Sequence, residues 1–334
     1  MSEKREKIHD KSKTSQKYVA CAILIAFLLS LPWLPIGGGP YFTHVCILIL
    51  TYIIATSSLR TIYISGQVSV GHAAFMGIGA YTSAVLSLRL GWTPWITMLL
   101  GALAAMVVAV LSGYLFSRLR ALYFSMVTLF FGVGVEALMR SWVSLTGGRS
   151  GLWGIPRLGG INVPGLGEID FVTSKIPHYY LLLFLTLLTI AVLFRLERSR
   201  SGVNWMAIAQ SPLVASSIGI SETKFRVLAF AVGCFFAGLA GSAYAHYSGV
   251  LSSSSFSLLP SIYLVIYMLL GGVGNFAGPI IGVIVLVATP ELFRALKEFT
   301  PFVFGGIMLL VIFLMPQGLA GLFQSVKSLL SKTF

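Results

Sequence analysis

Ten apolar runs separated by short polar segments cover most of this chain. A transmembrane helix needs about 20 apolar residues, and candidate runs lie at 18–35, 43–61, 68–88, 94–117, 121–145, 178–195, 225–247, 258–275, 278–291 and 301–318. The third run is rich in Gly, Ala and Ser, which favours packing against other helices over contact with lipid. The pattern predicts an all-α fold, a polytopic transmembrane helical bundle of about ten spans.

The composition excludes an ordinary soluble domain. The chain is 57% hydrophobic and only 10% charged, whereas soluble domains carry roughly 25% charged residues. A net charge of +13 would also suit a nucleic-acid-binding protein, but the cations lie in the short segments between apolar runs. We therefore expect contact with membrane lipid, no nucleic-acid partner, and a multi-pass membrane location.

The cation distribution predicts an orientation, because cytoplasmic loops carry an excess of Lys and Arg. With the N-terminus inside, most of the 23 Lys and Arg residues fall in cytoplasmic segments, so both termini are predicted to be cytoplasmic. The first run has no clean cleavage site after it and is interpreted as an uncleaved span. The predicted parts are a basic tail at 1–17, a transmembrane domain at 18–318 with an external loop at 146–177 and a cytoplasmic loop at 196–224, and a cytoplasmic tail at 319–334.

The segment 195–226 is the most polar interruption between spans. It holds two acids and five cations, namely Glu197, Glu222, Arg195, Arg198, Arg200, Lys224 and Arg226. Its apolar residues fall roughly on one helical face, namely Met206, Ile208, Leu213, Val214 and Ile218. This spacing predicts a short amphipathic helix over 202–220 that ends at Gly219. We expect a soluble cytoplasmic partner to act on this segment.

Two glycine-rich stretches bring polar groups to membrane depth. The candidate path or gate residues in the first stretch are Gly66, Gln67, Ser69, Gly71, His72 and Phe75; in the second they are Gly271, Gly272, Gly274, Asn275, Gly278 and Pro279. Glycine- and proline-interrupted segments in both halves of a chain are a sequence sign of a transport pathway. The alternative is that the small residues only permit close helix packing.

Charged residues within the spans are few. Glu136 and Arg140 lie four residues apart on one helix face and are expected to neutralise each other, with a substrate contact as the alternative. His72 is interpreted as a hydrogen-bonded packing residue and not as a proton relay, because its span contains no acid. The external loop at 146–177 either caps a pore mouth and meets an external partner, or is a solvated connector. Residues 291–299 are predicted to form an interfacial helix.

The sequence lacks the motifs of an enzyme or of an ATP site. It contains no GxxxxGK[ST] loop, no HExxH pair and no GxSxG motif. The cysteines Cys21, Cys46 and Cys234 lie in apolar runs without metal-ligand spacing, so we expect inert thiols, no metal and no cofactor. A pore of this kind is driven by a partner's ATPase or by an ion gradient. The scarcity of buried acids favours the partner.

Three blocks of this chain resemble one family, the permease subunits of ABC importers for branched-chain amino acids. The blocks are GQVSVGHAAFMGIGAYTSA (66–84), LTGGRSGLWGIP (145–156), and the region from VASSIGISETKFRVLAFAVGCFFAGLAGSAYAH (214–246) to LLGGVGNFAGPIIG (269–282). The resemblance covers roughly 45–320. Before and within the third block, the family often has charged residues where this chain has uncharged ones. These positions are Met206, Ala209, Gln210, Ser211, Pro212 and Ser216.

The resemblance implies a transport subunit and not an enzyme. It implies a homologous second permease, two cytoplasmic ABC ATPase subunits that bind the ATP, and an external substrate-binding protein. It makes 196–224 the coupling loop, with the ATPase contact at Val214, Ala215, Ser216, Gly219 and Ile220. The implied substrates are branched-chain amino acids, with urea or short amides as alternatives. The departures predict a less salt-dependent ATPase contact than in relatives.

Overall fold

The computed structural model of this protein describes residues 28–33, 39–116, 118–119, 121–163, 167–169, 171 and 174–292, and isolated positions at 305, 306, 309, 313, 319 and 321. Its α-helices are α2 (Pro40–Ile64), α3 (His72–Leu90), α4 (Pro94–Phe116), α5 (Ala121–Ser141), α6 (Val143–Thr146), α7 (Ile176–Glu197), α8 (Arg200–Gln210), α9 (Pro212–Ser217), α10 (Glu222–Ser248), α11 (Leu258–Gly271) and α12 (Gly278–Leu292). The shorter elements are the 3-10 turns η1 (Leu31–Trp33), η2 (Gly148–Ser150) and η3 (Ser253–Phe256), and the strands β1 (Leu152–Trp153), β2 (Ile161–Val163), β3 (Gly167–Ile169) and β4 (Val250–Leu251).

Seven helices in the described part are long and apolar enough to cross a membrane. They are Pro40–Ile64, His72–Leu90, Pro94–Phe116, Ala121–Ser141, Ile176–Glu197, Glu222–Ser248 and Ser253–Gly271, with Gly278–Glu291 as a shorter apolar helix. These helices confirm the predicted polytopic bundle and match the second to ninth predicted runs. Runs 18–35 and 301–318, both tails and most of 291–299 lie largely outside the described residues. The count of ten spans and the location of the termini therefore stay predictions.

Proline and glycine mark many helix boundaries, as their backbone chemistry requires. Pro94 is the first residue of α4 and Pro177 the second residue of α7, positions where the missing N–H has no helical partner to lose. Gly91 and Gly249 follow α3 and α10 in the left-handed conformation, with φ of +65° and +70°, which glycine adopts without steric cost.

Helices α2 and α10 form the centre of the bundle. Within an 18-residue apolar stretch of each helix, the buried share is 83% in α2, 78% in α10 and 61% in α3. Helix α10 packs against α4, α3 and α2, and α2 also packs against α7 and α12. The prediction that the third run packs mainly on other helices is confirmed, but α2 and α10 are more deeply enclosed.

Close approach of α3, α4 and α10 depends on small residues. A Cβ at Gly79 would lie 2.3 Å from the carbonyl oxygen of Gly238, and a Cβ at Gly241 would lie 2.0 Å from that of Met76. Contacts this short exclude any side chain at these positions. Close packing of this kind, rather than the hydrophobic effect, holds helices together within lipid.

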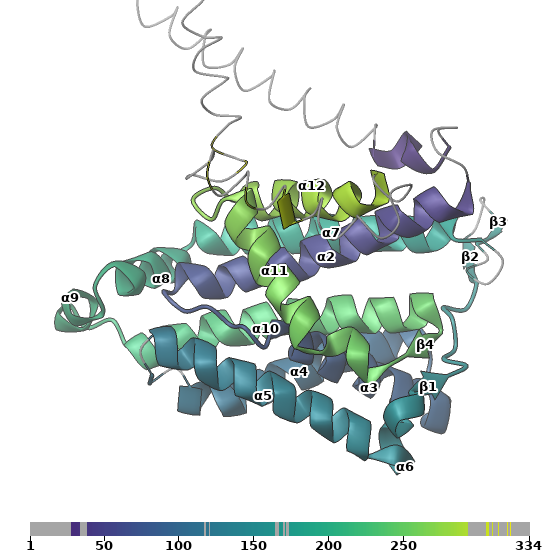
Figure 1. Ribbon diagram of the computed structural model, residues 1–334, viewed down its shortest axis with the longest axis horizontal. Helices are drawn as coiled ribbons and strands as arrows, with labels where there is room; N and C mark the ends of the chain where they lie inside the picture. The colour runs from purple at the N-terminus through teal and green to yellow at the C-terminus, as the bar shows by residue number, and fades with distance from the viewer. Residues whose placement is uncertain are drawn as a thin grey trace, which may run out of the picture.

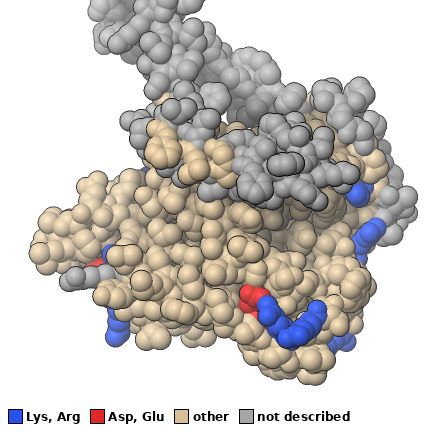
Figure 2. All heavy atoms as spheres, viewed as in Figure 1, with Lys and Arg blue, Asp and Glu red and all other residues tan. Residues whose placement is uncertain are grey.

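The two ends of the bundle differ in structure. Helices α8 and α9 extend past one end, while the four short strands lie at the other (Figure 1). There β1 pairs antiparallel with β4 and β2 with β3, so the described residues of the predicted external loop form short strands and turns and no long helix. On the face seen in Figure 2, the blue and red side chains lie just inward of the tan left tip and from the lower centre toward the right end, with a broad tan area between the two groups.

Replacing Gly241 tests the close packing. Gly241→Val places side-chain atoms against the Met76 backbone, so we expect a destabilisation of about 2 kcal/mol or more. The control is Gly134→Val on α5, because a Cβ at Gly134 meets no described atom within 4 Å. Thermal unfolding in detergent, followed by fluorescence-detected size exclusion, compares the two variants. Equal melting temperatures would contradict the packing argument.

Candidate functional site

The segment predicted as one helix over 202–220 is two helices, α8 and α9. The break lies at Ser211, which has an extended backbone, with φ −156° and ψ 101°. Ser211 caps α9 by accepting a hydrogen bond from the backbone N–H of Val214 at 3.4 Å, and Pro212 begins the new helix. A proline cannot continue a helix interior, because it lacks the N–H and its ring clashes with the preceding turn. The single-helix prediction is therefore wrong.

The predicted common apolar face is also wrong, because of this break. Ile208 on α8 is fully buried, whereas Leu213 and Val214 on α9 and Ile218 just after it are 81%, 61% and 70% exposed. Met206 on α8 is 39% exposed. The bend turns α8 toward the bundle and leaves the apolar residues of α9 facing outward.

Gly219 ends α9 as predicted. Its φ is +85°, its N–H donates to the Ser216 carbonyl at 3.0 Å, and the N–H of Ile220 donates to the Ala215 carbonyl at 3.0 Å. This is the Schellman arrangement, which favours glycine in the left-handed position. Of the predicted coupling residues, Val214, Ser216 and Gly219 are exposed, Ile220 is half-buried and Ala215 is buried.

Trp205 anchors the projection to the bundle. It is fully buried, and its indole Nε1 donates to the Phe225 carbonyl of α10 at 2.7 Å. Helix α8 is thereby fixed to the start of α10. Sequence reasoning did not single out Trp205, although a tryptophan inside a polar, basic segment is a signal that could have found it.

Arg60 joins three parts of the chain at this end. It lies near the end of α2 and is 4% exposed. Its two Nη atoms donate to both carboxylate oxygens of Glu197, at 2.6 and 3.0 Å, and its Nε donates to the Val273 carbonyl at 3.2 Å. The guanidinium also lies 5.4 Å from the ring centroid of Phe276. The end of α7, just before α8, is thus bonded to α2 and to the turn between α11 and α12.

The first glycine-rich stretch begins with an irregular segment, so α3 starts at His72 and not at 68. Gly66 has φ +83°, and a Cβ there would lie 3.0 Å from the Cα of Ala209 on α8. A Cβ at Gly71 would lie 2.0 Å from the Thr128 carbonyl oxygen of α5. Backbone and side-chain bonds from Val70 to Thr128 and from Ser125 to Val68 hold the segment on α5. The segment 66–71 therefore packs between α5 and α8.

Several polar groups of this segment are buried without partners. Gln67 and Ser69 are fully buried, and neither side chain has a hydrogen-bond partner among the described residues. The same holds for Thr56 and Ser57 on α2. Buried polar atoms are normally paired with protein or water. These side chains are therefore candidates for contact with water or a polar solute.

His72 and Phe75 lie inside the bundle. His72 Nε2 is 2.9 Å from the Ser58 hydroxyl, which supports the packing interpretation, while its Nδ1 has no partner in the described part of the chain. Phe75 is fully buried between Phe131, stacked at 5.3 Å, and Phe230, edge-on at 5.2 Å.

The second glycine-rich stretch is a tight turn between α11 and α12. A Cβ at Gly271 would lie 2.1 Å from the Gly278 carbonyl oxygen, and a Cβ at Gly278 would lie 1.7 Å from that of Gly272. Gly278 donates its N–H to the Asn275 carbonyl at 3.1 Å, and Pro279 follows as the second residue of α12. Gly274 is exposed with open space around it. The tight contacts at Gly271 and Gly278 match the alternative that small residues permit close helix packing, whereas Gly274 does not.

The first stretch contacts α11, the helix that leads into the second stretch. The Ser261 hydroxyl of α11 accepts from the backbone N–H of Ala73 at 3.1 Å. A cavity of about 160 Å³ lies beside this contact, bordered by α2, α3, α10, η3 and α11. Tertiary structure thus places the first stretch beside the helix that leads into the second.

The remaining predicted groups are the charge pair on α5 and the cysteines. Glu136 and Arg140 form the predicted ion pair on α5, with the Arg140 side chain 48% exposed. Cys46 and Cys234 are free thiols; Cys21 lies outside the described residues. In the described part, no group of three or more His, Cys, Asp and Glu could hold a metal ion.

These features define a multi-pass helical membrane protein with a two-helix projection at one end. A family model for the "Branched-chain amino acid transport system / permease component" matches residues 41–315. This chain belongs to that family of ABC transporter permeases.

Two relatives are LivM proteins, each named a high-affinity branched-chain amino acid transport system permease protein. LivM of Escherichia coli (strain K12) is 31% identical, covering 93% of this chain and 76% of the relative. LivM of Salmonella typhimurium is 29% identical with the same coverage. The nucleoside ABC transporter permease protein NupC of Lactococcus lactis is 27% identical over 54% of this chain and 59% of that protein. No solved structure matches the chain.

The Arg60–Glu197 pair generates a stability prediction. Arg60→Gln leaves a largely buried carboxylate unpaired, so we expect the free energy of unfolding to fall by about 3 kcal/mol. The double variant Arg60→Gln/Glu197→Gln should recover most of this loss. Arg140→Gln, at the more exposed pair, is the matched control and should cost about 1 kcal/mol or less. Thermal unfolding in detergent measures all three, and a loss at Arg60 no larger than at Arg140 would contradict the assignment.

Proposed function

We propose that this chain is the permease subunit of a binding-protein-dependent ABC importer and forms half of a translocation path for branched-chain amino acids. A homologous permease supplies the other half, two separate ATPase subunits drive transport, and an external binding protein delivers the substrate. The observation that carries the proposal is similarity to LivM proteins along 93% of the chain.

The structure supports the position of the ATPase contact. Helix α9 projects from the bundle (Figure 1) and exposes Leu213, Val214 and Ile218. Large exposed apolar side chains on a short projection between two spans are suited to a protein interface. We place this end in the cytoplasm and the strand end outside, in agreement with the positive charge of 195–226.

Motion at α9 has a direct structural route to the candidate path. Helix α8 contacts Gly66, and Glu197, three residues before α8, holds Arg60 beside the α11–α12 turn. We assign the path to the face formed by α3, α11 and the segment 65–71, where buried polar groups lack partners. An ATP-driven shift of α8 would therefore act on both glycine-rich stretches.

Nucleosides are a second candidate substrate. The support is the similarity to NupC and to the guanosine permease NupQ of Bacillus subtilis, each over 54% of this chain. The LivM similarity covers much more of the chain, which favours amino acids.

Uptake by the reconstituted assembly tests the function. The assembly is purified through a tag on this chain in mild detergent, its subunits are identified by mass spectrometry, and proteoliposomes are loaded with ATP. We expect L-leucine uptake that vanadate blocks and an uncoupler does not, and no uptake of uridine. Leucine uptake by the chain alone in ATP-free vesicles would show an ion-driven carrier, and uridine uptake without leucine uptake would favour the nucleoside permeases.

Charged substitutions on α9 test the ATPase contact. Leu213→Asp and Ile218→Asp place a carboxylate at the exposed apolar surface, so we expect recovery of the ATPase in pull-downs to fall about tenfold or more. Val143→Asp is the matched control, since Val143 is 69% exposed on α6 near the strand end. Full ATPase recovery with both α9 variants, at normal membrane insertion, would show that the ATPase binds elsewhere.

A further inference from the structure

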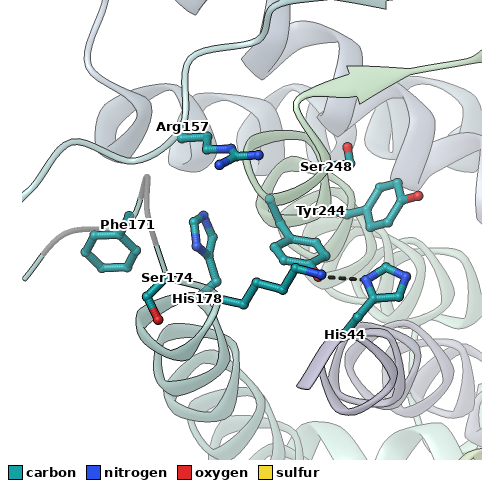
Figure 3. A pocket seen from close by; sticks show the side chains of 9 residues that line it. His44, Arg157, Phe171, Ser174, His178, Tyr244 and Ser248 are labelled. Atoms are coloured by element: carbon teal, nitrogen blue, oxygen red, sulfur yellow. Dashed lines mark hydrogen bonds between the residues drawn. The ribbon is translucent and has the colours of Figure 1, made fainter. Parts of the chain in front are cut away.

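The end of the bundle opposite α9 contains a second, larger cavity. Its volume is about 330 Å³, and it lies between α2, the segment after β1, the start of α7 and the end of α10 (Figure 3). Cavities from about 300 Å³ upward are the usual size of small-molecule sites. None of the sequence motifs accounts for this cavity.

The polar lining of the cavity is cationic. Arg157 and Lys175 are the cations that line it, and His44 and His178 add ring nitrogens beside the ring of Tyr247; no Asp or Glu among the described residues lines the cavity. Glu291 of α12 is hydrogen-bonded to the hydroxyl of Tyr41, one helical turn before His44, and does not border the cavity. The charge balance of the lining therefore favours an anionic group.

His178 provides a second, independent sign of a ligand. It is only 3% exposed, and its Nε2 has no hydrogen-bond partner within the described part of the chain. The rings of Phe171 and Tyr247 pack edge-on against it, at 5.3 and 5.4 Å. Figure 3 shows the imidazole directed toward the guanidinium of Arg157. An unpaired buried nitrogen beside an arginine is a place where a bound oxygen atom would complete the hydrogen bonding.

The walls around these groups are fixed by contacts of their own. His44 Nδ1 lies 2.6 Å from the Tyr247 hydroxyl, and the two rings stack at 5.7 Å. Lys175 Nζ donates to the Pro40 carbonyl at 3.3 Å, which ties the start of α7 to the start of α2. These contacts hold the donors in place before a ligand arrives, which lowers the entropic cost of binding.

We propose that this cavity binds the carboxylate of a small organic acid, and that under the proposed function this acid is the amino acid on its way into the path. Arg157 and His178 hold the carboxylate, and Lys175 adds positive charge. A small molecule is favoured over an acidic side chain of a partner protein because His178 is almost completely buried. Tyr244 borders both this cavity and the 160 Å³ cavity beside α3 and α11, which gives the ligand a continuation toward the candidate path.

Saturation-transfer NMR on the purified assembly tests the site, with L-leucine, L-leucinamide and acetate as probes. Arg157→Gln removes the charge and His178→Phe removes the ring nitrogens while keeping an aromatic ring. We expect each variant to weaken leucine and acetate binding about tenfold or more and to leave the weaker leucinamide binding unchanged. Arg157→Lys should retain part of the affinity. Arg149→Gln, at an exposed arginine of η2 outside the cavity, is the control of equal charge change.

The outcomes separate the site from the function. Leucine uptake with binding that neither variant alters would overturn the site and leave the permease function standing. Acetate binding that both variants abolish, in an assembly that neither binds nor transports leucine, would support the carboxylate site and overturn the amino acid function. Equal displacement of leucine by inorganic phosphate, or equal loss with Arg149→Gln, would reduce the site to a general effect of positive charge and overturn the proposal.

Discussion

The bidentate ion pair of Arg60 and Glu197 is the interaction on which the arrangement of the α8–α9 end depends. A buried guanidinium is costly unless its donors are satisfied, and here they reach Glu197 and the Val273 carbonyl. Helix α2, the end of α7 and the α11–α12 turn cannot separate without leaving that charge unpaired. The pair therefore joins the end of α2, the end of α7 and the α11–α12 turn into one unit, immediately before α8.

Small residues supply the complementary constraint in the centre of the bundle. Within lipid the hydrophobic effect contributes little to helix association, so close backbone packing has to stabilise it. Gly79, Gly238 and Gly241 provide it among α3, α4 and α10. A rigid central layer of this kind allows movement at α8 to be passed to the segment 65–71, which contacts α8 at Gly66, instead of being absorbed by loose packing.

Polar groups divide the molecule into three functional zones along its length. The α9 end exposes apolar side chains, the segment 65–71 buries Gln67 and Ser69 without hydrogen-bond partners among the described residues, and the strand end holds the cavity around His178. Tyr244 borders both this cavity and the 160 Å³ cavity beside α3 and α11. Under the proposed function, the substrate would enter at the strand end and leave at the α9 end.

The sequence by itself determined the membrane class, eight of the helices, the stop at Gly219 and the pairing of Glu136 with Arg140, because hydrophobic length, glycine chemistry and i,i+4 spacing are local properties. It could not show that Ser211 and Pro212 turn α9 away from α8, although a proline at that position indicates a break in a helix. It also could not show that Arg60 and Glu197 meet, or that His44, Arg157 and His178 share a cavity. Those residues lie far apart in the chain, and only the packing of helices against one another brings them within bonding distance.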